Sequence, residues 1–400
     1  MRTIRVHGLC TIAAVSVLFI LPAVASMAQP IDVAVMTQNL YVGADTTPIL
    51  AATTLADLQK AILDAADSVV ANKFPLRAAA IASEVASAGG PLLIGLQEAE
   101  IVTESDVPQP LNYADTLIVA LKALGLNYTY KIPELEDAVH TGFVLDSGAA
   151  GILNPRFTLT DQEVVLVRTD VPNFTITSVS VRTFVNDVTV DTLLGQFSLK
   201  RGYVLVNALL NGVPFQFVST HLAETHDLTE PAEVGEILEA LGTTVERQLV
   251  VGDFNAGPDE VCGGSPCGPE QMVAAGFADT GRGLGSTCCQ SPTLDNPESS
   301  LTHRYDYIFE RDFHAIYSAA LVGDQPFEEV RPLWPSDHAG VASTIAQVAG
   351  APGFSNCFGV SISTLSRQFG GLNTAAKALG FSDVQALQDA VRALCDRSGA

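Results

Sequence analysis

Short apolar runs, each about the length of a β-strand, recur through most of the chain and alternate with longer helical stretches. This alternation constrains the fold more than any other feature, because strands and helices that alternate pack as layers around a sheet. The expected strands are Ile31–Thr37, Leu92–Leu96, Val164–Val167, Val204–Leu209, Phe215–Ser219, Gln248–Val251, Tyr305–Phe309 and Val341–Ile345. The expected helices are Leu55–Val70, Pro75–Ala88, Tyr113–Leu124 and Pro231–Leu241. The pattern predicts a layered α/β or α+β domain.

The first 28 residues have the pattern of a secretory signal peptide. Arg2 and Arg5 precede an apolar run from Leu9 to Ala25, and small residues follow it. We expect cleavage after Ala25 or Ala28, and a secreted or periplasmic protein. The alternative is a membrane anchor, because the run approaches the length of a spanning helix. No later segment of the sequence is long and apolar enough to span a bilayer.

The chain is strongly acidic, with 44 Asp and Glu residues against 21 Lys and Arg residues and a formal net charge of −23. This balance argues against a protein whose overall electrostatic field would attract it to nucleic acid. It does not exclude an enzyme that meets a phosphate through a bound metal ion.

The cysteines after the expected signal peptide are even in number, as in proteins of oxidising compartments. They are Cys262, Cys267, Cys288, Cys289, Cys357 and Cys395. We expect Cys357 to pair with Cys395, because the two bracket one helical segment, and such a loop contributes roughly 3–4 kcal/mol. The other four lie in a Gly/Pro-rich loop and are expected to pair locally. A zinc site is the alternative, although the spacing and the lack of nearby histidines do not suit one.

The character of the sequence changes near Gly350, beyond which only helix is expected. We place a boundary near residue 348, with a main domain over 29–347 and a helical segment over 354–400. In that segment Ser382 is expected to cap a helix, with Gln385 reaching back to it. One face of this helix would carry Val384, Leu387, Val391 and Leu394. The segment is either a separate partner-binding cap or a packed terminus.

Carboxylates, amides and imidazoles stand where the expected strands end. In "LVVGDFNAGPD", from Leu249 to Asp259, Asp253 and Asn255 directly follow an apolar run. Other strand ends carry Gln38-Asn39, Gln97-Glu98, Thr220-His221, Asp306 and Asp337-His338. The alternative for a single Asp or Asn is a turn residue, because these side chains bond nearby backbone groups. Strand ends that meet at one edge of a packed sheet would instead form a site for a divalent cation and phosphoester hydrolysis.

The chemistry of that reaction assigns roles to three of these residues, Glu98, Asp253 and Asn255. Mg²⁺ prefers hard oxygen ligands and keeps several waters, so Glu98 and a substrate phosphate would suffice to hold it. Asp253 would accept a hydrogen bond or proton from the attacking water, and Asn255 would fix the direction of that water.

The imidazoles would handle charge and protons. A carboxylate such as Asp306 would set the tautomer of a histidine and favour its charged form. His338 would then stabilise the phosphorane charge, and His221 would contact the phosphate or protonate the leaving oxygen.

Six ordered motifs resemble the endonuclease/exonuclease/phosphatase superfamily, which includes deoxyribonuclease-I-like nucleases. The motifs are "TQNLY", "IGLQEAE", "VSTHLAE", "VVGDFNAGPD", "HRYDYIF" and "WPSDHAGV", and they cover about Val33 to Ile345. The resemblance implies a four-layer α/β sandwich, in which helices flank two packed central sheets, and makes 29–347 the catalytic domain. It also implies a divalent metal at the sheet ends, with Mg²⁺ expected and Mn²⁺ or Ca²⁺ as alternatives.

The resemblance implies roles for single positions as well. The metal positions are Asn39, Glu98 and Asp337, of which Asn39 supports both the metal and the catalytic acid. The catalytic positions are His221 on the phosphate, Asp253 and Asn255 at the water, and Asp306 paired with His338. Arg304 matches no assigned role, and a partner for a nearby acid is the alternative for it.

Three classes of function remain open for this site. A nuclease ranks first, because Gly285 to Ile308 resembles a secreted bacterial branch for which that is the commonest interpretation. A phospholipid hydrolase of the sphingomyelinase kind, or a small-molecule phosphoester hydrolase, is the second class. Basic loops for nucleic acid are scarce, and the sequence shows no aromatic hairpin for membrane contact. A silent binding module would be expected to lose Glu98, Asp253 or His338, and all are present.

We expect the protein to be a monomer.

Overall fold

The computed structural model describes residues 31–225, 227–245, 247–328 and 332–396. The expected signal peptide, residues 1–28, lies outside these ranges. Two large β-sheets dominate the described part of the chain, as the resemblance to the superfamily implies.

The larger sheet contains the first strand of the domain near its middle. Its strand order is β18 (Ala315–Val322), β19 (Gly340–Gln347), β1 (Asp32–Asn39), β2 (Leu93–Gln97), β7 (Phe157–Arg168), β3 (Ile101–Glu104) and β4 (Leu111–Asn112), with β5 (Tyr128–Thr129) and β6 (Val139–Asp146) also paired to β7. Strands β1 and β2 are parallel, so their carboxyl ends lie at the same edge.

The smaller sheet carries the "GDFN" strand between two neighbours. Its order is β16 (Ala278–Asp279), β17 (Asp306–Arg311), β13 (Gln248–Asp253), β12 (Val213–His221), β11 (Gly202–Leu210) and β8 (Phe174–Thr183). Strands β12 and β13 are parallel, and β17 is antiparallel to β13. Small two-stranded hairpins are formed by β9 (Thr189–Thr192) with β10 (Gly195–Ser198), and by β14 (Val261–Cys262) with β15 (Ser265–Pro266).

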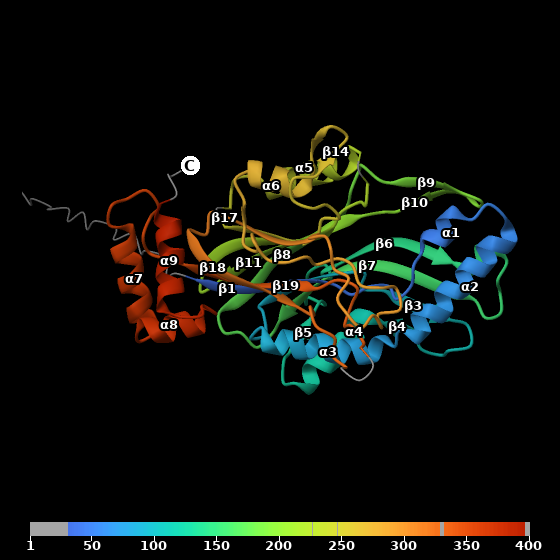
Figure 1. Ribbon diagram of the computed structural model, residues 1–400, viewed down its shortest axis with the longest axis horizontal. Coiled ribbons are helices and arrows are strands. Elements are labelled where there is room, and N and C mark those ends of the chain that lie inside the picture. Colours follow the sequence, from blue (N-terminus) through green and yellow to red (C-terminus); the bar gives the residue numbers. More distant parts are fainter. Residues whose placement is uncertain (1–30, 226, 246, 329–331, 397–400) are drawn as a thin grey trace, which may run out of the picture.

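Helices cover the outer face of each sheet. Helices α3 (Phe74–Ser87) and α4 (Tyr113–Ala123) pack on the larger sheet, while α5 (Thr229–Leu241) and α6 (Gly268–Ala274) pack on the smaller one, on opposite sides of the molecule (Figure 1). The inner faces of the sheets share one apolar core. The expected four-layer α/β sandwich is therefore confirmed.

Two glycines allow the strands that carry the polar residues to approach closely. A Cβ on Gly95 of β2 would lie 2.5 Å from Ser219 Oγ and 2.7 Å from a methyl group of Val251 on the other sheet. A Cβ on Gly252 would lie 2.1 Å from the carbonyl oxygen of Thr220, and its φ of +155° also favours glycine. Larger residues at these positions would push β2, β12 and β13 apart.

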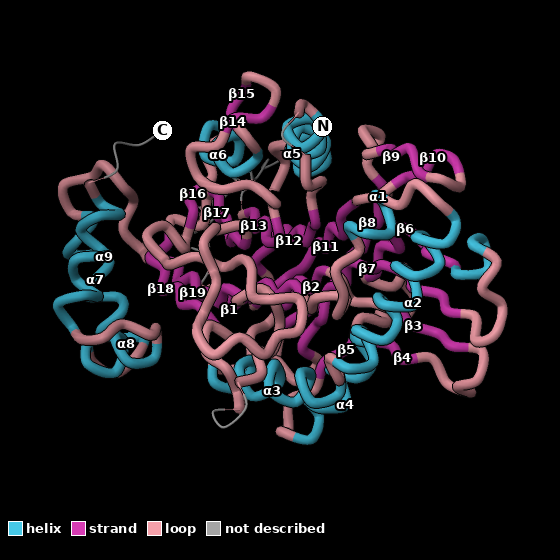
Figure 2. Tube along the Cα trace, turned by 45° about the vertical axis from the view of Figure 1, so that its right-hand side comes forward, coloured by secondary structure: helices cyan, strands magenta, loops and turns pink. Residues whose placement is uncertain are grey.

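The C-terminal segment forms three helices that pack at one end of the larger sheet (Figures 1 and 2). They are α7 (Cys357–Gln368), α8 (Leu372–Ala378) and α9 (Val384–Cys395). Leu387 and Val391 of α9 are buried in one cluster with Ile316 of β18 and Ala346 of β19. The segment therefore packs on the main domain, and a partner-binding role for it stays a prediction.

The predicted cap of α9 is wrong by one residue. Asp383 is the N-cap, and its Oδ1 accepts the Ala386 N–H at 2.8 Å. A cap must directly precede the first helical residue for its side chain to reach the third N–H of the helix. Because α9 begins at Val384, Ser382 is one position too early for this bond.

The disulfides follow the predicted pattern. Cys357 is bonded to Cys395, and the four remaining cysteines pair locally as Cys262–Cys267 and Cys288–Cys289. These bonds leave none of the six thiols free for a zinc site. Within the part of the chain that the structure describes, no helix combines the length and apolar character needed to cross a membrane.

Candidate active site

Three strands of the smaller sheet place polar side chains in one row. The register pairs His221 of β12 with Asp253 of β13, and pairs Asp253 with Asp306 of β17. Directly paired residues share a face of the sheet, so residues far apart in sequence become neighbours here. His221 Nε2 lies 3.7 Å from Asp253 Oδ2, and all three side chains are buried.

The larger sheet brings Asn39 and Glu98 to the same place. Asn39 Nδ2 donates to Glu98 Oε1 at 3.1 Å and to Asp253 Oδ2 at 3.0 Å. The N–H of Tyr41 donates to Asn39 Oδ1 at 2.9 Å, which fixes the orientation of the amide. Asn39 therefore bridges the two sheets and holds two carboxylates with its NH₂ group. A role as a direct metal ligand stays a prediction.

Glu98 is held in an uncommon backbone conformation at the end of β2. Its φ is +50°, a left-handed value that costs a non-glycine residue roughly 1 kcal/mol or more and that is concentrated at functional sites. The N–H of Val42 donates to Glu98 Oε2 at 2.7 Å. Each carboxylate oxygen thus accepts one hydrogen bond from Asn39 or Val42 and keeps a lone pair for a further partner.

His338 is paired with Asp306 in the centre of the site. His338 Nδ1 lies 2.8 Å from Asp306 Oδ2 and 3.7 Å from Asp253 Oδ2. Burial alone would lower the pKa of His338, but the carboxylates of Asp306, Asp253 and Asp337 together raise it well above its ordinary value. The charged imidazolium predicted from the sequence is therefore favoured by its surroundings.

Asn255 has the role of a turn residue in this arrangement. Its N–H donates to Asp253 Oδ1 at 2.9 Å, and its Nδ2 donates to the carbonyl oxygen of Leu222 at 2.9 Å. These bonds stabilise the chain after β13, where Asn255 has a φ of +50°. Asp253 Oδ2 is left to face Asn39 and the histidines. That Asn255 also directs the attacking water stays a prediction.

Two carboxylates of the site resist ionisation. Burial raises the pKa of Asp253 to about 7, while His338 lowers it and Asp306 raises it. Burial also raises the pKa of Asp337 to about 7, with His338 lowering it and Glu98 raising it. Burial therefore makes the ionised form of both carboxylates less favourable, and a nearby positive charge would favour it.

The donor set fits a divalent cation. Ligand atoms of Asp253, Asp306 and His338 lie within 4.8 Å of one another, and Asp306 Oδ1 is buried with no hydrogen-bond partner among the described residues. Because Asp306 Oδ2 is hydrogen-bonded to His338 Nδ1, we expect these two residues to form an ion pair with each other rather than to bind a metal ion together. Glu98 and Asp337 supply the hard, partly exposed oxygens that Mg²⁺ prefers.

Sequence reasoning missed Arg201, which contacts His221 directly. Arg201 Nη1 lies 2.9 Å from His221 Nδ1 and 3.2 Å from Asp161 Oδ2. A guanidinium only donates, so His221 Nδ1 must accept and the ring proton must sit on Nε2. Burial, with Arg201 and His338 nearby, lowers the pKa of His221 well below its ordinary value. His221 is therefore a neutral Nε2–H donor.

Arg77 is a second residue that the sequence did not reveal. It is fully buried on α3, and its guanidinium donates to the carbonyl oxygens of Asn72, Leu40, Tyr41 and Pro335 at 2.6–3.2 Å. These bonds tie the segment that follows β1 to the loop that precedes β19. A charge in an alanine-rich apolar helix was the only signal for it.

The vicinal cysteines lie beside the site. Cys289 Sγ is 3.8 Å from His338 Nε2. Thr287 of the same loop accepts the Ala339 N–H with its carbonyl oxygen at 2.8 Å and the Asp306 N–H with its hydroxyl at 3.1 Å. The loop thus forms one wall of the site.

Arg304 lies outside this cluster. Its Nη1 donates to Asp279 Oδ1 at 3.2 Å, and its guanidinium lies 4.3 Å from the ring centre of Tyr307. The alternative interpretation, a partner for a nearby acid, describes its contacts.

The chain is similar to known proteins in structure rather than in sequence. No protein-family model matches it, and no curated relative was found. A solved structure of an endonuclease/exonuclease/phosphatase family protein from Bacteroides thetaiotaomicron is similar with a TM-score of 0.50 and 16% identity, over 80% of this chain and 96% of that one.

Two further solved structures are similar over most of their length. Truncated TDP2 from Caenorhabditis elegans has a TM-score of 0.44 and 17% identity, over 79% of this chain and 97% of that one. A mannosyl-6-phosphatase from Bacteroides thetaiotaomicron has a TM-score of 0.47 and 16% identity, over 78% of this chain and 99% of that one. The similarity to the Bacteroides thetaiotaomicron family protein, together with the sheet order and the convergent strand ends, shows that this chain has the endonuclease/exonuclease/phosphatase fold.

Proposed function

We propose that the protein is a divalent-metal-dependent phosphodiesterase that cleaves its substrate by attack of water on phosphorus. One observation carries this proposal: Asn39 joins Glu98 of one sheet to Asp253 of the other, and Asp253 Oδ2 lies 3.7 Å from both His221 Nε2 and His338 Nδ1. A cluster of hard oxygens, a charged imidazole and a neutral N–H donor suits hydrolysis of a phosphoester.

Asp253 is the acceptor for the attacking water. Its Oδ1 is occupied by the Asn255 N–H, whereas its Oδ2 is oriented by Asn39 toward the histidines. Because this oxygen is fixed before the substrate arrives, it can orient the water and receive its proton without rearrangement.

The two histidines act on the phosphate oxygens in different ways. His338, held by Asp306, places a positive charge where negative charge develops. His221, held by Arg201, donates its Nε2–H to a phosphate oxygen. Each imidazole is fixed by a partner on its Nδ1, so their roles do not interchange.

Glu98 and Asp337 would hold the divalent cation, with Asn39 orienting the Glu98 carboxylate. When bound, the cation supplies a Lewis acid that polarises the phosphoryl oxygen and offsets the carboxylate charge. Hard oxygen donors favour Mg²⁺, with Mn²⁺ and Ca²⁺ as alternatives.

A silent binding module is disfavoured by the same residues. Glu98, Asp253 and His338 are all present and in mutual contact through Asn39 and Asp306. Nuclease activity, which the sequence ranks first, stays a prediction among phosphodiester substrates.

We also propose a secreted monomer. The signal-like pattern of residues 1–28 supports export, and so do the disulfides Cys262–Cys267 and Cys357–Cys395, since such bonds persist in oxidising compartments. The cell fraction that holds the protein, and its mass in solution, test this part.

A substrate panel tests the proposed function. The full chain should be offered DNA, RNA, sphingomyelin, phosphatidylinositol and bis-p-nitrophenyl phosphate, each with Mg²⁺, Mn²⁺, Ca²⁺ or chelator. We expect hydrolysis of at least one diester with a divalent cation, and none by Asp253→Asn. Diester cleavage that Asp253→Asn leaves intact would contradict the proposal.

A further inference from the structure

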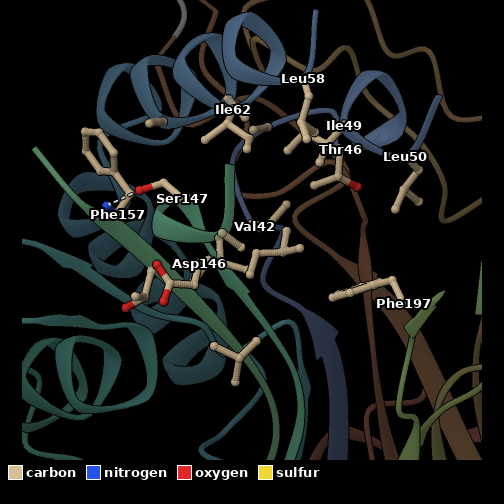
Figure 3. A pocket seen from close by; sticks show the side chains of 18 of the residues that line it. Val42, Thr46, Ile49, Leu50, Leu58, Ile62, Asp146, Ser147, Phe157 and Phe197 are labelled. Carbon is tan, nitrogen blue, oxygen red and sulfur yellow. Dashed lines mark hydrogen bonds between the residues drawn. The ribbon is translucent and has the colours of Figure 1, made fainter. Parts of the chain in front are cut away.

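A cavity of about 300 Å³ lies next to the active site, at the end of the molecule formed by α1 (Thr47–Ala51), α2 (Leu55–Ala71) and the β9–β10 hairpin. Ile49 of α1, Leu58 and Ile62 of α2 and Phe197 of β10 line it, and Figure 3 shows these side chains around a common space. The volume is at the lower end of the range for small-molecule sites.

The charges of the cavity argue against an anionic occupant. No Lys, Arg or His is among the described residues that line it, whereas Glu104 and Asp146 are. Asp146 is already paired, because Arg156 Nε donates to its Oδ1 at 2.8 Å. A nucleic-acid backbone would find two carboxylates and no cation here, so the lining suits an uncharged apolar group.

Val42 lies between the cavity and the proposed metal site and contacts both. The Val42 side chain lines the cavity (Figure 3), while its N–H donates to Glu98 Oε2 at 2.7 Å. The Tyr113 hydroxyl donates to the Val42 carbonyl oxygen at 2.9 Å, so the residue is fixed from both sides. Val102, four residues after Glu98, also lines the cavity.

Exposed apolar side chains belong to the cavity lining or lie next to it in sequence. Leu193 and Leu194 at the turn between β9 and β10 are 43% and 51% exposed, and Val70 of α2 is 67% exposed. Leu194 and Val70 belong to the cavity lining as well. Exposed apolar groups beside an apolar cavity indicate a binding site.

We propose that this cavity binds an alkyl or acyl chain of the substrate, and that the substrate class is an amphiphilic phosphodiester whose phosphate lies at Glu98 and Asp253. The inference rests on the proposed function and adds the substrate class to it. The fixed Val42 segment sets the distance between chain and phosphate, so substrates that carry both groups gain from both sites.

A chain-length series tests the inference directly. Methyl p-nitrophenyl phosphate and octyl p-nitrophenyl phosphate share one leaving group and one phosphodiester, and differ only in the apolar chain. With a divalent cation present and the octyl ester kept monomeric, we expect kcat/KM to be roughly tenfold or more higher for the octyl ester.

A matched pair of variants assigns the gain to the cavity. Ala66→Trp on α2 would fill the space, because Ala66 lines it, whereas Ala71→Trp places the same side chain at an exposed position of that helix. Ala66→Trp should abolish the octyl advantage and keep the methyl rate, while Ala71→Trp should keep both. Melting temperatures show that each variant is folded.

A binding measurement reads the cavity without catalysis. The uncharged probe N-phenyl-1-naphthylamine should fluoresce with the wild type, be displaced by decanol, and lose signal in Ala66→Trp only.

The outcomes separate this inference from the proposed function. No hydrolysis of either ester with any cation would refute the proposed function and the inference with it. Equal kcat/KM for the two esters, or an octyl advantage that survives Ala66→Trp, would overturn the inference alone. Efficient cleavage of single-stranded DNA that Ala66→Trp leaves unchanged would likewise overturn the substrate class.

Discussion

Removal of the Arg201 contact should impair catalysis through His221 rather than through folding. Arg201 Nη1 is 2.9 Å from His221 Nδ1 and also donates a hydrogen bond to Asp161 Oδ2 at 3.2 Å. Arg201→Met alone would leave the buried Asp161 carboxylate uncompensated, which typically costs about 3–5 kcal/mol of stability. The informative variant is therefore Arg201→Met combined with Asp161→Asn, with Asp161→Asn alone as the matched control.

The magnitude follows from the kind of bond that is lost. A hydrogen bond from a charged donor contributes about 1.5–3 kcal/mol. If it holds His221 in its productive tautomer, kcat/KM should fall roughly 10- to 150-fold relative to the control. Arg201 also lowers the pKa of His221, after burial, so this pKa should rise in the double variant.

Two measurements check the reasoning on the same samples. Steady-state kinetics on bis-p-nitrophenyl phosphate gives kcat/KM, and ¹⁵N-resolved NMR reports which ring nitrogen of His221 carries the proton. The control should keep the proton on Nε2, and the double variant should populate both tautomers. Equal kcat/KM and the same tautomer in control and double variant would refute the role of Arg201.

Other predictions concern the carboxylates and the paired histidine. Asp253→Asn should lower turnover by about 10²–10⁴-fold with little change in substrate binding, and Asn255→Ala should cost less, as single-turnover kinetics would show. His338→Ala and Asp306→Ala should each impair turnover, and the double variant should be far less than additive, whereas strict additivity would separate the two residues. Burial raises the pKa of Glu233 from 4.5 to about 8, so the folded state holds an extra proton between these values and its stability falls as pH rises through them. Glu233→Gln should therefore match the wild-type melting temperature at pH 4 and exceed it at pH 8; an equal difference at both pH values would contradict this.

The strand-end residues could be predicted because their signals are local. An apolar run identifies a strand, and an Asp, Asn or His directly after it marks the edge where β1, β2, β12 and β13 end. Six motifs in order then predict which ends converge. The same reasoning identified the Cys357–Cys395 bond, which encloses a single helical segment.

The partners of these residues depend on contacts that no short stretch encodes. Arg201 and His221 meet because β11 and β12 are antiparallel neighbours, whereas Arg77 meets Pro335 across 258 positions. The sequence showed these arginines only as isolated charges. Their roles follow from which carbonyls and ring nitrogens surround them after folding.

The strands that the sequence did not predict include β8 and β18, and the apolar cavity was not predicted either. Strand β8 alternates Thr and Ser with apolar residues and is only partly buried, so it lacks the continuous apolar run used for the other strands. Strand β18 is an edge strand rich in alanine, which has little strand preference. The cavity forms only where α1, α2 and the β9–β10 hairpin come together, so the sequence of no single segment predicts it.

The central claim is that Glu98 holds a divalent cation on which phosphodiester cleavage depends. It is tested most directly by the Mg²⁺ dependence of bis-p-nitrophenyl phosphate hydrolysis in the wild type and in Glu98→Gln. The account predicts no activity in chelator, recovery as Mg²⁺ is added back, and a much weaker recovery in the folded Glu98→Gln variant. Turnover that is unchanged by chelator, or Glu98→Gln with the wild-type Mg²⁺ response, would contradict it.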